Sequence, residues 1–555
     1  MTTPSTSTAG IDRRWDLAVG LGLAGLAIAL LWPLLRPGPL VVPDMDDAYF
    51  NIWRLAWVAH QLVRHPSALF DGNIFFPATG TLAYSDAMLL VGLLGAPFVW
   101  AGVPVAAVHD GLLWLAFASS GWAMYALARR LTGDRWAAAL AGVLIICGPY
   151  RLAHIAHLEL QWVLWMPLAL VAVHALVARP SPPAGLALGA GLAGQFLCSI
   201  YYGVFLTLYA GVAWVADAVR VRAPLGPLLR GTAIAALPLA IVVGPYLVPY
   251  ARTREAHGPR PAAEVARYSA TVADYGRIPL LEAVRGTEDT GPAPEERTVY
   301  PGTAALAVAL LAFMRPRRRE VWVYAALAVV AFDASLGVNG LTFRLLRTLV
   351  PPLENLRAAA RFGSLVLVSI AGLAAMGAAG LGARVGEPAR RTILATAMAL
   401  AIAEAWVMPL PVRNALSEAT PADRWLATLP EDTVLVELPV PQLHRLWGYE
   451  TSHEVRSIHH WRRLVNGYSG FAPREYVRFL AAMTNFPDEE SLTRLRILSV
   501  DYVVVRRANF ADDDAFARQT RALVASPAFG APQFFGDGRG QVAIFPLRSG
   551  PDGRP

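Results

Sequence analysis

The chain has 555 residues, of which 55% are of hydrophobic types and only 16% are charged, and its mean hydropathy is +0.42. Soluble domains carry about 45 to 50% apolar and about 25% charged residues, so this composition excludes a single water-soluble globule. Disorder needs low hydrophobicity and high net charge and is excluded as well. The net charge of +7 involves 48 basic residues, all arginine, that do not cluster on one soluble face, so we expect no nucleic-acid partner. The two cysteines, Cys147 and Cys198, lie in apolar segments, which excludes a disulfide framework.

Long apolar segments follow one another along the first 410 residues. A membrane-spanning helix needs about 20 mostly apolar residues to cross a hydrocarbon core of roughly 30 Å. The first segment, Trp15 to Leu35, has no small-residue cleavage site and is long for a signal peptide, so we expect a retained anchor. Further spans are expected at about 107–128, 136–149, 162–178, 184–198, 203–219, 231–250, 303–314, 321–338, 362–381 and 392–408. The sequence thus predicts an α-helical polytopic membrane protein with about 11 transmembrane helices.

The loops between these segments differ in charge. Short cytoplasmic loops accumulate Lys and Arg. With a cytoplasmic N-terminus, the cytoplasmic loops are rich in Arg and nearly free of acid, namely 128–135, the loop after Ala178, 220–230, 315–319 and 382–391. This alternation requires that the apolar stretch from Met88 to Val105, which glycines and prolines interrupt, does not cross, so we expect an outer interfacial or re-entrant helix there. We predict a multi-pass protein of a bacterial plasma (inner) membrane.

Two long loops, 36–106 and 251–302, then lie on the outer face, together with the tail. Residues 1–410 are expected to form the transmembrane domain and residues 411–555 an extracytoplasmic α/β domain. The tail mixes charge with three β-like runs, Val434–Val440, Val500–Arg507 and Gln541–Leu547, and the helical stretches PADRWLATL and PREYVRFLAAM lie between them.

The first outer loop brings Asp44, Asp46 and Asp47 close to the end of the first helix. Carboxylates at this depth are well placed to act on a lipid-linked substrate. The residues that follow have the spacing of a helix lying along the interface, with Phe50, Trp53, Trp57 and Leu62 on its apolar face. The alternative is a solvated acidic loop that caps this helix, since Asp is a good N-cap.

A second outer cluster is YRLAHIAHLELQW, which supplies His154, His157 and Glu159. Imidazole and carboxylate groups can bind a divalent metal such as Mg or Mn, or the cluster can hold a phosphate. The spacing matches no metalloprotease motif, so the metal stays open and no other cofactor is indicated. The alternative is a pair of interfacial histidines that bond water and carbonyls.

Two further groups are candidates for substrate binding. Arg357 and Arg361 are four residues apart, and a guanidinium suits a phosphate bidentately. The alternatives are anchoring to lipid headgroups or pairing with nearby acids. In the tail, His460, Asn466 and Tyr468 belong to a polar, aromatic segment of the kind that binds sugars, or to a turn built on Asn466-Gly467.

The order of these features resembles the GT-C superfamily of polytopic glycosyltransferases, and more narrowly a group of bacterial membrane proteins of that type. The segments that carry the resemblance are DAYFNIWRLAWVAHQL, LFDGNIFFPATGTLAYSDAMLL, YRLAHIAHLELQWVLWMPLAL, LRAAARFGSL, HHWRRLVNGYSGFAPREY and LRILSVDYVVVR. By this resemblance Asp47 stands at the loop-one catalytic acid and Asp86 at a second acidic position, and Asp46 is a neighbouring candidate.

The resemblance implies transfer of a sugar from a polyprenyl-phosphate donor to an extracytoplasmic glycan, lipid or protein acceptor, with inversion and an aspartate as base. Two other classes stay open: a transporter or flippase, and a non-catalytic envelope assembly protein. Transport needs charged groups at mid-membrane. Most of the charges within the spans lie near predicted ends: Asp110, His174, Asp217, Asp333 and Glu404.

Overall fold

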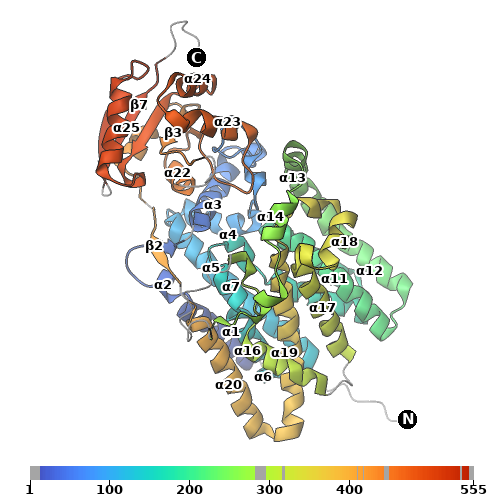
Figure 1. Cartoon of the computed structure of the whole chain (residues 1–555). Helices are drawn as coiled ribbons and strands as arrows, with labels where there is room; N and C mark the ends of the chain where they lie inside the picture. Colours follow the sequence, from blue (N-terminus) through green and yellow to red (C-terminus); the bar gives the residue numbers. More distant parts are fainter. Residues whose placement is uncertain are drawn as a thin grey trace, which may run out of the picture.

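The computed structural model contains a bundle of helices with a smaller α/β domain at one end (Figure 1). It describes residues 13–44, 46–279, 281, 295–314, 319–408, 410–416, 418–442, 449–537 and 540–548. The N-terminal residues 1–12, most of the arginine-rich loop predicted at 315–319 and part of the outer loop predicted at 251–302 lie outside the described residues.

The helices of the bundle and its outer loops follow the predicted segments closely. They are α1 (Arg13–Leu30), α2 (Trp32–Leu35), α3 (Asp46–Arg64), α4 (Leu89–Trp100), α5 (Val105–Thr132), α6 (Arg135–Ile146), α7 (Pro149–Ala153), α8 (Leu158–Gln161), α9 (Trp165–Ala178), α10 (Pro182–Cys198), α11 (Ile200–Val221), α12 (Leu225–Pro238), α13 (Gly244–His257), α14 (Ala262–Arg267), α16 (Thr303–Leu310), α17 (Arg319–Ser335), α18 (Thr342–Leu349), α19 (Gly363–Val385) and α20 (Glu387–Trp406).

Six helical segments of the described chain are long and apolar enough to cross a membrane: Val105–Thr132, Arg135–Ala153, Leu158–Ala178, Ile200–Val221, Leu225–His257 and Ala359–Val385. The other predicted spans also fall on helices. Among them α10 and α17 have 17 residues, the short limit for a span, and α1 and α20 carry several charges. The chain is a multi-pass membrane protein, whereas the number of eleven crossings and their direction stay predictions.

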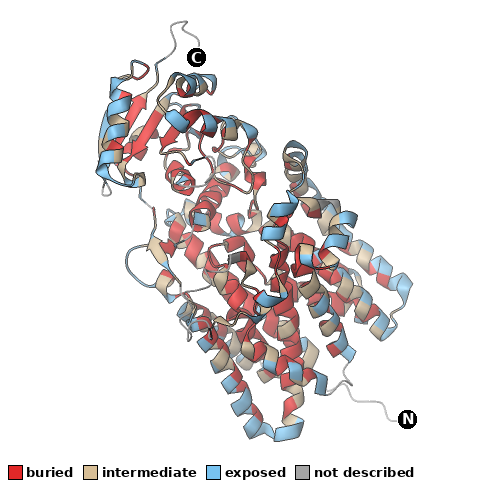
Figure 2. Ribbon diagram, viewed as in Figure 1, coloured by how far each residue is buried: buried red, intermediate tan, exposed pale blue. Residues whose placement is uncertain are grey.

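The bundle has a buried centre and an exposed outer surface (Figure 2). Its central helix is α19, which packs against α5, α6, α16, α17 and α20. The segment Leu225–His257 lies at the periphery and exposes large apolar side chains such as Leu237 and Ile241, which suits contact with lipid.

Small residues let the helices approach closely. A Cβ at Gly185 on α10 would lie 2.2 Å from the carbonyl oxygen of Gly231 on α12, and one at Gly377 on α19 would lie 2.3 Å from that of Val308 on α16. Any side chain there would force these helices apart. Membrane helices, which gain little from burying apolar surface in lipid, pack through such contacts.

The segment after α2 is hydrogen-bonded to the chain that leads into the tail. Strand β1 (Val41–Pro43) pairs antiparallel with β2 (Val412–Asn414), and α3 begins three residues after β1. Helix α3 packs on α4 and on α22 of the tail domain, so it lies between bundle and domain. Helix α4 has 12 residues, or roughly 18 Å at 1.5 Å per residue, which is too short to cross.

The tail domain contains a five-stranded mixed sheet in the order β4-β3-β5-β7-β6, with β3 parallel to β4 and β5, and β7 antiparallel to β5 and β6. The strands β3 (Val434–Leu438), β5 (Tyr502–Arg506) and β7 (Gly540–Pro546) lie on the three predicted runs, whereas β4 (Arg463–Leu464) and β6 (Gln533–Asp537) were not predicted. The helices are α21 (Pro421–Leu426), α22 (Glu450–Ser457), α23 (Arg474–Ala482), α24 (Glu489–Ile497) and α25 (Asp513–Ala525).

Candidate active site

A cavity of about 520 Å³ lies where loops at one end of the bundle meet the tail domain. Residues of α3, α11, α13 and the loop before α19 line it, together with residues 468–471 of the tail. The structure brings together in this cavity the predicted residues Asp47, Asp86, His157, Glu159, Arg357, Arg361 and Tyr468.

Asp47 lies in the first turn of α3, and its carboxylate is held from two sides. The phenol of Tyr468 donates a hydrogen bond of 3.0 Å to Asp47 Oδ1, and His157 Nε2 lies 3.6 Å from Asp47 Oδ2. The Asp47 side chain remains 26% exposed. The carboxylate is therefore oriented by the protein and still accessible to a ligand in the cavity.

A line of polar groups continues from Asp47 into the protein. His157 Nδ1 lies 3.5 Å from Glu159 Oε1, and Glu159 Oε2 accepts a hydrogen bond of 3.1 Å from Arg54. Arg54 is 1% exposed and donates as well to the side-chain oxygen of Asn51 and to the backbone carbonyl of Asp86. Glu159 balances the charge of the buried Arg54. The same carboxylate lies beside Nδ1 of His157 and so holds the His157 ring beside Asp47.

Asp86 lines the cavity, and both of its oxygens accept hydrogen bonds at the start of α11. The backbone N–H of Ile200 donates at 2.6 Å, and the Ser199 hydroxyl donates at 3.0 Å. Burial, reinforced by the negative charge of Glu159, raises the pKa of Asp86 to about 6. The contacts make Asp86 the group that anchors the first turn of α11.

Arginines line another part of the cavity. Arg357 Nη1 and Arg260 Nη1 donate to the same atom, Glu264 Oε1, at 3.1 Å and 3.3 Å. Arg260 also donates to the carbonyl of Gly470 at 2.7 Å, and its guanidinium lies 3.5 Å from the centroid of the Phe471 ring. Two guanidinium groups thus share one carboxylate, which leaves an excess positive charge for an anionic ligand.

Arg361 is bound differently. Its Nε donates to Glu296 Oε2 at 3.0 Å and its Nη2 donates to Glu296 Oε1, and both side chains are less than 10% exposed. On the other side of Glu296, His154 Nε2 lies 3.4 Å from Oε2. Burial alone would raise the pKa of Glu296, but Arg361 holds it well below its ordinary value. The Arg361 charge is therefore offset within the protein.

The remaining wall of the cavity is apolar and belongs to helices of the bundle. It includes Ile200, Val204 and Leu208 of α11, spaced four residues apart on one face, and Leu247 of α13. Both helices belong to segments that are long and apolar enough to span a membrane. A ligand in the cavity therefore meets polar groups on one side and membrane helices on the other.

The tail reaches the cavity through the loop that carries Tyr468. Buried carboxyl groups of α22 hold this loop. Glu450 accepts hydrogen bonds from the Gly467 N–H (2.9 Å) and the Asn466 amide (3.2 Å), and Glu454 accepts one from the Tyr468 N–H (2.5 Å). The Asn466 amide also bonds both backbone groups of Glu437 in β3.

Four predicted residues do not line the cavity. His154 is completely buried beside it and stacks on the Tyr150 ring, with ring centroids 4.3 Å apart. Asp46 points to Arg413, 3.5 Å away, and to Thr451. Asn466 is buried behind the Tyr468 loop, and His460 is buried in the tail, where its Nδ1 accepts from the Arg462 N–H. Of the three tail residues that were predicted to bind a sugar, Tyr468 lines the cavity, and His460 and Asn466 do not.

Arg54 and Glu296 belong to the site but were not predicted. Arg54 follows Asp47 by seven residues, two helical turns, so the spacing of α3 alone could have placed it on the face of Asp47. No spacing in the sequence could have identified Glu296, because its partner Arg361 is 65 residues away in the chain.

The described residues include no group of three or more His, Cys, Asp or Glu side chains arranged to hold a metal ion. In the cavity, His157 lies between Asp47 and Glu159, with one ring nitrogen facing each carboxylate, and so the three do not converge on one point. This donor set does not fit a Mg or Mn centre.

No protein-family model matches the chain, and no curated protein matches it in sequence. Among solved structures it is similar to the arabinofuranosyltransferase AftD from Mycobacteria over 98% of its length, with a TM-score of 0.62 and 19% identity. It is also similar to the archaeal oligosaccharyltransferase AglB from Archaeoglobus fulgidus over 98% of its length (TM-score 0.50, 13% identity) and to ArnT from Cupriavidus metallidurans over 96% (TM-score 0.50, 12% identity). The chain spans 42% of the AftD chain, 75% of AglB and 98% of ArnT.

At these identities the similarity concerns the fold. The chain shares its fold with AftD, AglB and ArnT, and this is the fold that the resemblance to the GT-C superfamily implied.

Proposed function

We propose that the protein is an inverting glycosyltransferase that transfers a sugar from a polyprenyl-phosphate donor to an extracytoplasmic glycan, lipid or protein. The observation that carries this proposal is the composition of one cavity: an oriented, accessible Asp47, arginines in excess over their carboxylate, and an apolar wall from membrane helices. Asp47 suits the hydroxyl of an acceptor, the arginines suit a phosphate, and the apolar wall suits a lipid chain. The AglB structure, which holds a dolichol-phosphate, supports a lipid-linked donor by analogy of fold.

In the proposed reaction, Asp47 Oδ2 accepts the proton of the acceptor hydroxyl while that oxygen bonds to the anomeric carbon. The bond between the anomeric carbon and the phosphate oxygen breaks in the same step, and polyprenyl phosphate leaves from the opposite face, so the configuration inverts. Arg357 and Arg260 stabilise the negative charge that develops on the leaving phosphate. His157 and Tyr468 keep the Asp47 carboxylate in position, and Glu159 and Arg54 fix His157.

The other predicted residues receive structural roles in this proposal. Asp86 anchors α11, which forms the apolar wall, and Arg361 with Glu296 and His154 supports the floor of the cavity. The reaction takes place on the extracytoplasmic side, where the tail domain lies in the predicted topology.

The contacts of the charged groups in the bundle do not favour transport. His174 Nδ1 lies 2.9 Å from Asp217, Asp110 lies 2.9 Å from its neighbour His109, and Glu404 accepts hydrogen bonds from Thr303. Each is satisfied by a local partner, whereas a transport path places such groups along a shared cavity.

Adjacent aspartates in α3 allow a matched test. Asp47→Asn and Asp46→Asn are each expressed in membranes and assayed with radiolabelled polyprenyl-phosphate sugars. Asp47→Asn is expected to lower transfer by roughly 10²- to 10⁴-fold, the usual contribution of a general base, while Asp46→Asn is expected to retain it. Unchanged transfer by well-expressed Asp47→Asn, or equal losses in both variants, would refute the role of Asp47. Analysis of the product anomer then checks inversion.

A further inference from the structure

Two short helices, α4 and α18, lie in the half of the bundle that is nearer the tail domain (Figure 1). With 12 and eight residues they are too short to cross a membrane. Helix α4 ends shortly before α5 begins, and α18 begins shortly after α17 ends. Because α5 and α17 are both predicted spans, we expect the two short helices near the depth at which a span leaves the membrane.

Helix α4 has one packed face and one exposed face. On the packed face, a Cβ at Gly92 would lie 2.7 Å from Cγ1 of Val58 on α3, so a glycine lets the two helices approach this closely. On the exposed face lie Leu93, Leu94 and Phe98, of which Phe98 is 57% exposed. No residue of α4 is charged or carries a hydroxyl group, so this face offers a partner only hydrocarbon.

Helix α18, with the residue before it, exposes a stripe of three leucines. They are spaced four residues apart and are each more than half exposed: Leu341, Leu345 and Leu349. Phe343 and Arg347 lie on the opposite side, since each residue turns the helix by about 100°. Phe343 is buried, and Arg347 donates a hydrogen bond of 3.0 Å to the carbonyl of Arg260. The leucines therefore point away from the protein.

A tight turn fixes α18 at the end of α17. The Asp333 carboxylate accepts a hydrogen bond of 3.0 Å from the Leu341 N–H, and a Cβ at Gly340 would lie 2.1 Å from the carbonyl oxygen of Asp333. The orientation of the leucine stripe is therefore set by the protein. Val329, one turn before Asp333 on α17, is 65% exposed, so exposed apolar surface runs from this span to α18.

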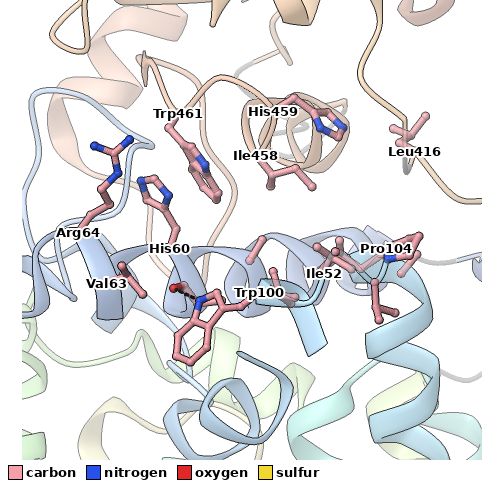
Figure 3. Close-up of a pocket in the computed structure, with 17 residues that line it drawn as sticks. Ile52, His60, Val63, Arg64, Trp100, Pro104, Leu416, Ile458, His459 and Trp461 are labelled. Carbon is pink, nitrogen blue, oxygen red and sulfur yellow. Dashed lines mark hydrogen bonds between the residues drawn. The ribbon is translucent and has the colours of Figure 1, made fainter. Parts of the chain in front are cut away.

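The helix that the sequence places along the interface, α3, is instead covered on both sides. Three of its four predicted interfacial residues are buried: Phe50, Trp53 and Trp57. Figure 3 shows Trp461 of the tail domain facing His60 on one side of α3 and Trp100, at the end of α4, on the other. The Trp100 indole N–H donates a hydrogen bond of 3.0 Å to the Ala59 carbonyl. The expectation that α3 lies in the interface is therefore wrong, and of these two helices α4 has the exposed apolar face.

The charge of α18 favours a lipid surface over an apolar protein surface as its partner. The helix has two arginines and no acid, and Arg344 is exposed beside the leucine stripe. Guanidinium groups bind lipid phosphates. A helix with leucines on one face and arginine at the border of that face is typical of helices that lie in a membrane surface.

We propose that α4 and α18 insert their exposed faces into the leaflet on the side of the tail domain, with Arg344 at the depth of the lipid phosphates. The partner of this surface is the bilayer. The inserted helices hold the candidate active site at the membrane, because α4 supports α3, which carries Asp47, and α18 holds Arg260 through Arg347. Only this effect on the site rests on the proposed function.

The insertion is tested with the full chain in nanodiscs, labelled with an environment-sensitive fluorophore at Leu93→Cys or Leu345→Cys. The two native cysteines are buried, and the unsubstituted chain, treated with the same reagent, gives the background. Ile241→Cys on the peripheral segment and Glu490→Cys on α24 are the references for lipid and water, since both positions are exposed. Fluorescence is quenched either by a nitroxide on the lipid acyl chain or by iodide in solution.

The nitroxide is expected to quench the labels at the Leu93 and Leu345 positions as it quenches the label at the Ile241 position, and iodide is expected to quench only the label at the Glu490 position. If iodide quenches either label in α4 or α18, the proposal is overturned. If neither quencher reaches a label, a protein surface covers that helix, and the proposal is overturned as well. This measurement does not depend on sugar transfer.

The role of Arg344 is tested by the choice of lipid. With the label at the Leu345 position, nitroxide-bearing phosphatidylglycerol is expected to bind in preference to nitroxide-bearing phosphatidylcholine by roughly fivefold, the effect of one arginine at an anionic surface. Arg344→Gln is expected to abolish this preference. Equal quenching by the two lipids in the wild type, or a preference that survives in Arg344→Gln, would remove Arg344 from the lipid contact.

Leu345→Glu tests the effect on the site. This variant is expected to raise the KM for the polyprenyl-phosphate donor roughly twofold to thirtyfold with kcat retained, the range for coupling between distant sites. Ile497→Glu, at a similarly exposed apolar residue of α24, is the control and should leave this KM unchanged. A donor KM unchanged in Leu345→Glu would refute the coupling of α18 to the site. Transfer that survives in Asp47→Asn would refute the proposed function and leave the quenching result in place.

Discussion

The Tyr468 phenol donates a 3.0 Å hydrogen bond to Oδ1 of Asp47, although 421 residues separate the two in the chain. Asp47 belongs to the first turn of α3, and Tyr468 belongs to the tail domain. The Phe50 and Tyr468 rings, with centroids 5.2 Å apart, pack edge to face beside this bond. The tail domain is therefore part of the candidate active site, because it orients the carboxylate that the proposed mechanism uses as base.

Removal of this bond tests that contribution. Tyr468→Phe keeps the ring and its packing and deletes the hydroxyl. Because a hydrogen bond to a charged group contributes about 1.5–3 kcal/mol, we expect the turnover rate to fall by roughly 10- to 100-fold, with little change in stability. The measurement is sugar transfer in membranes together with thermal unfolding. Tyr449→Phe, on an exposed tyrosine of the same domain, is the control, and equal activities of the two variants would contradict the prediction.

The Glu454 carboxyl group accepts a hydrogen bond from the backbone N–H of Tyr468. Its protonation makes the stability of the protein depend on pH. Burial raises the pKa of Glu454 well above its ordinary value, so folding favours the neutral form of this carboxyl group. For an acid whose folded pKa is raised, the stabilising contribution is complete below its unfolded pKa, about 4.3, and is lost as the pH rises through the folded value.

Glu454→Gln keeps the acceptor for the Tyr468 N–H and cannot ionise. We therefore expect normal transfer and an unfolding temperature that falls less between pH 5 and pH 9 than in the wild type. Glu454→Ala removes the acceptor and is expected to lose both stability and transfer. Glu490→Gln, on an exposed residue of α24, serves as reference, and a wild-type pH profile in Glu454→Gln would contradict the assignment of the titrating group.

Much of the site follows from the sequence because its residues lie near the ends of recognisable helices. Asp47, His157, Glu159 and Arg357 each adjoin an apolar segment whose end was predictable, and outer ends of neighbouring helices meet at one surface. Residue spacing did not distinguish Asp46 from Asp47, because consecutive helical residues point about 100° apart and either can face the cavity. The contact with Arg413, paired through β1 and β2, decides that Asp46 faces away.

Contacts between distant segments explain what the sequence did not show. The Arg361–Glu296 pair joins residues 65 apart without a local pattern, so the sequence did not decide between a phosphate and an acid as the partner of Arg361. Strand β4 has two residues, too few for an alternating pattern, yet it places the loop that carries Tyr468. These contacts depend on tertiary packing.

Asp86 is expected to give the stability a second dependence on pH. Burial and the nearby Glu159 charge raise its pKa to about 6, so its stabilising contribution is complete below pH 3.8 and is lost as the pH rises through about 6. Asp86→Asn keeps an oxygen that can accept from the Ile200 N–H, so we expect transfer within a few-fold of the wild type at pH 7 and a weaker decline of unfolding temperature between pH 4 and pH 8. A loss of transfer as large as that of Asp47→Asn would instead make Asp86 a catalytic residue.

Arg357 and Arg361 are predicted to differ in what their removal affects. Arg357 shares Glu264 with Arg260, so Arg357→Ala leaves that carboxylate paired, and we expect normal stability with a KM for the polyprenyl-phosphate donor raised roughly 10-fold or more. Arg361→Leu leaves the buried Glu296 without its partner, which costs about 3–5 kcal/mol, so this variant is expected to unfold at lower temperature. The double variant Arg361→Leu with Glu296→Leu removes both charges and should recover most of the stability. If Arg361→Leu is stable and raises only the donor KM, Arg361 binds the phosphate and the roles of the two arginines are reversed.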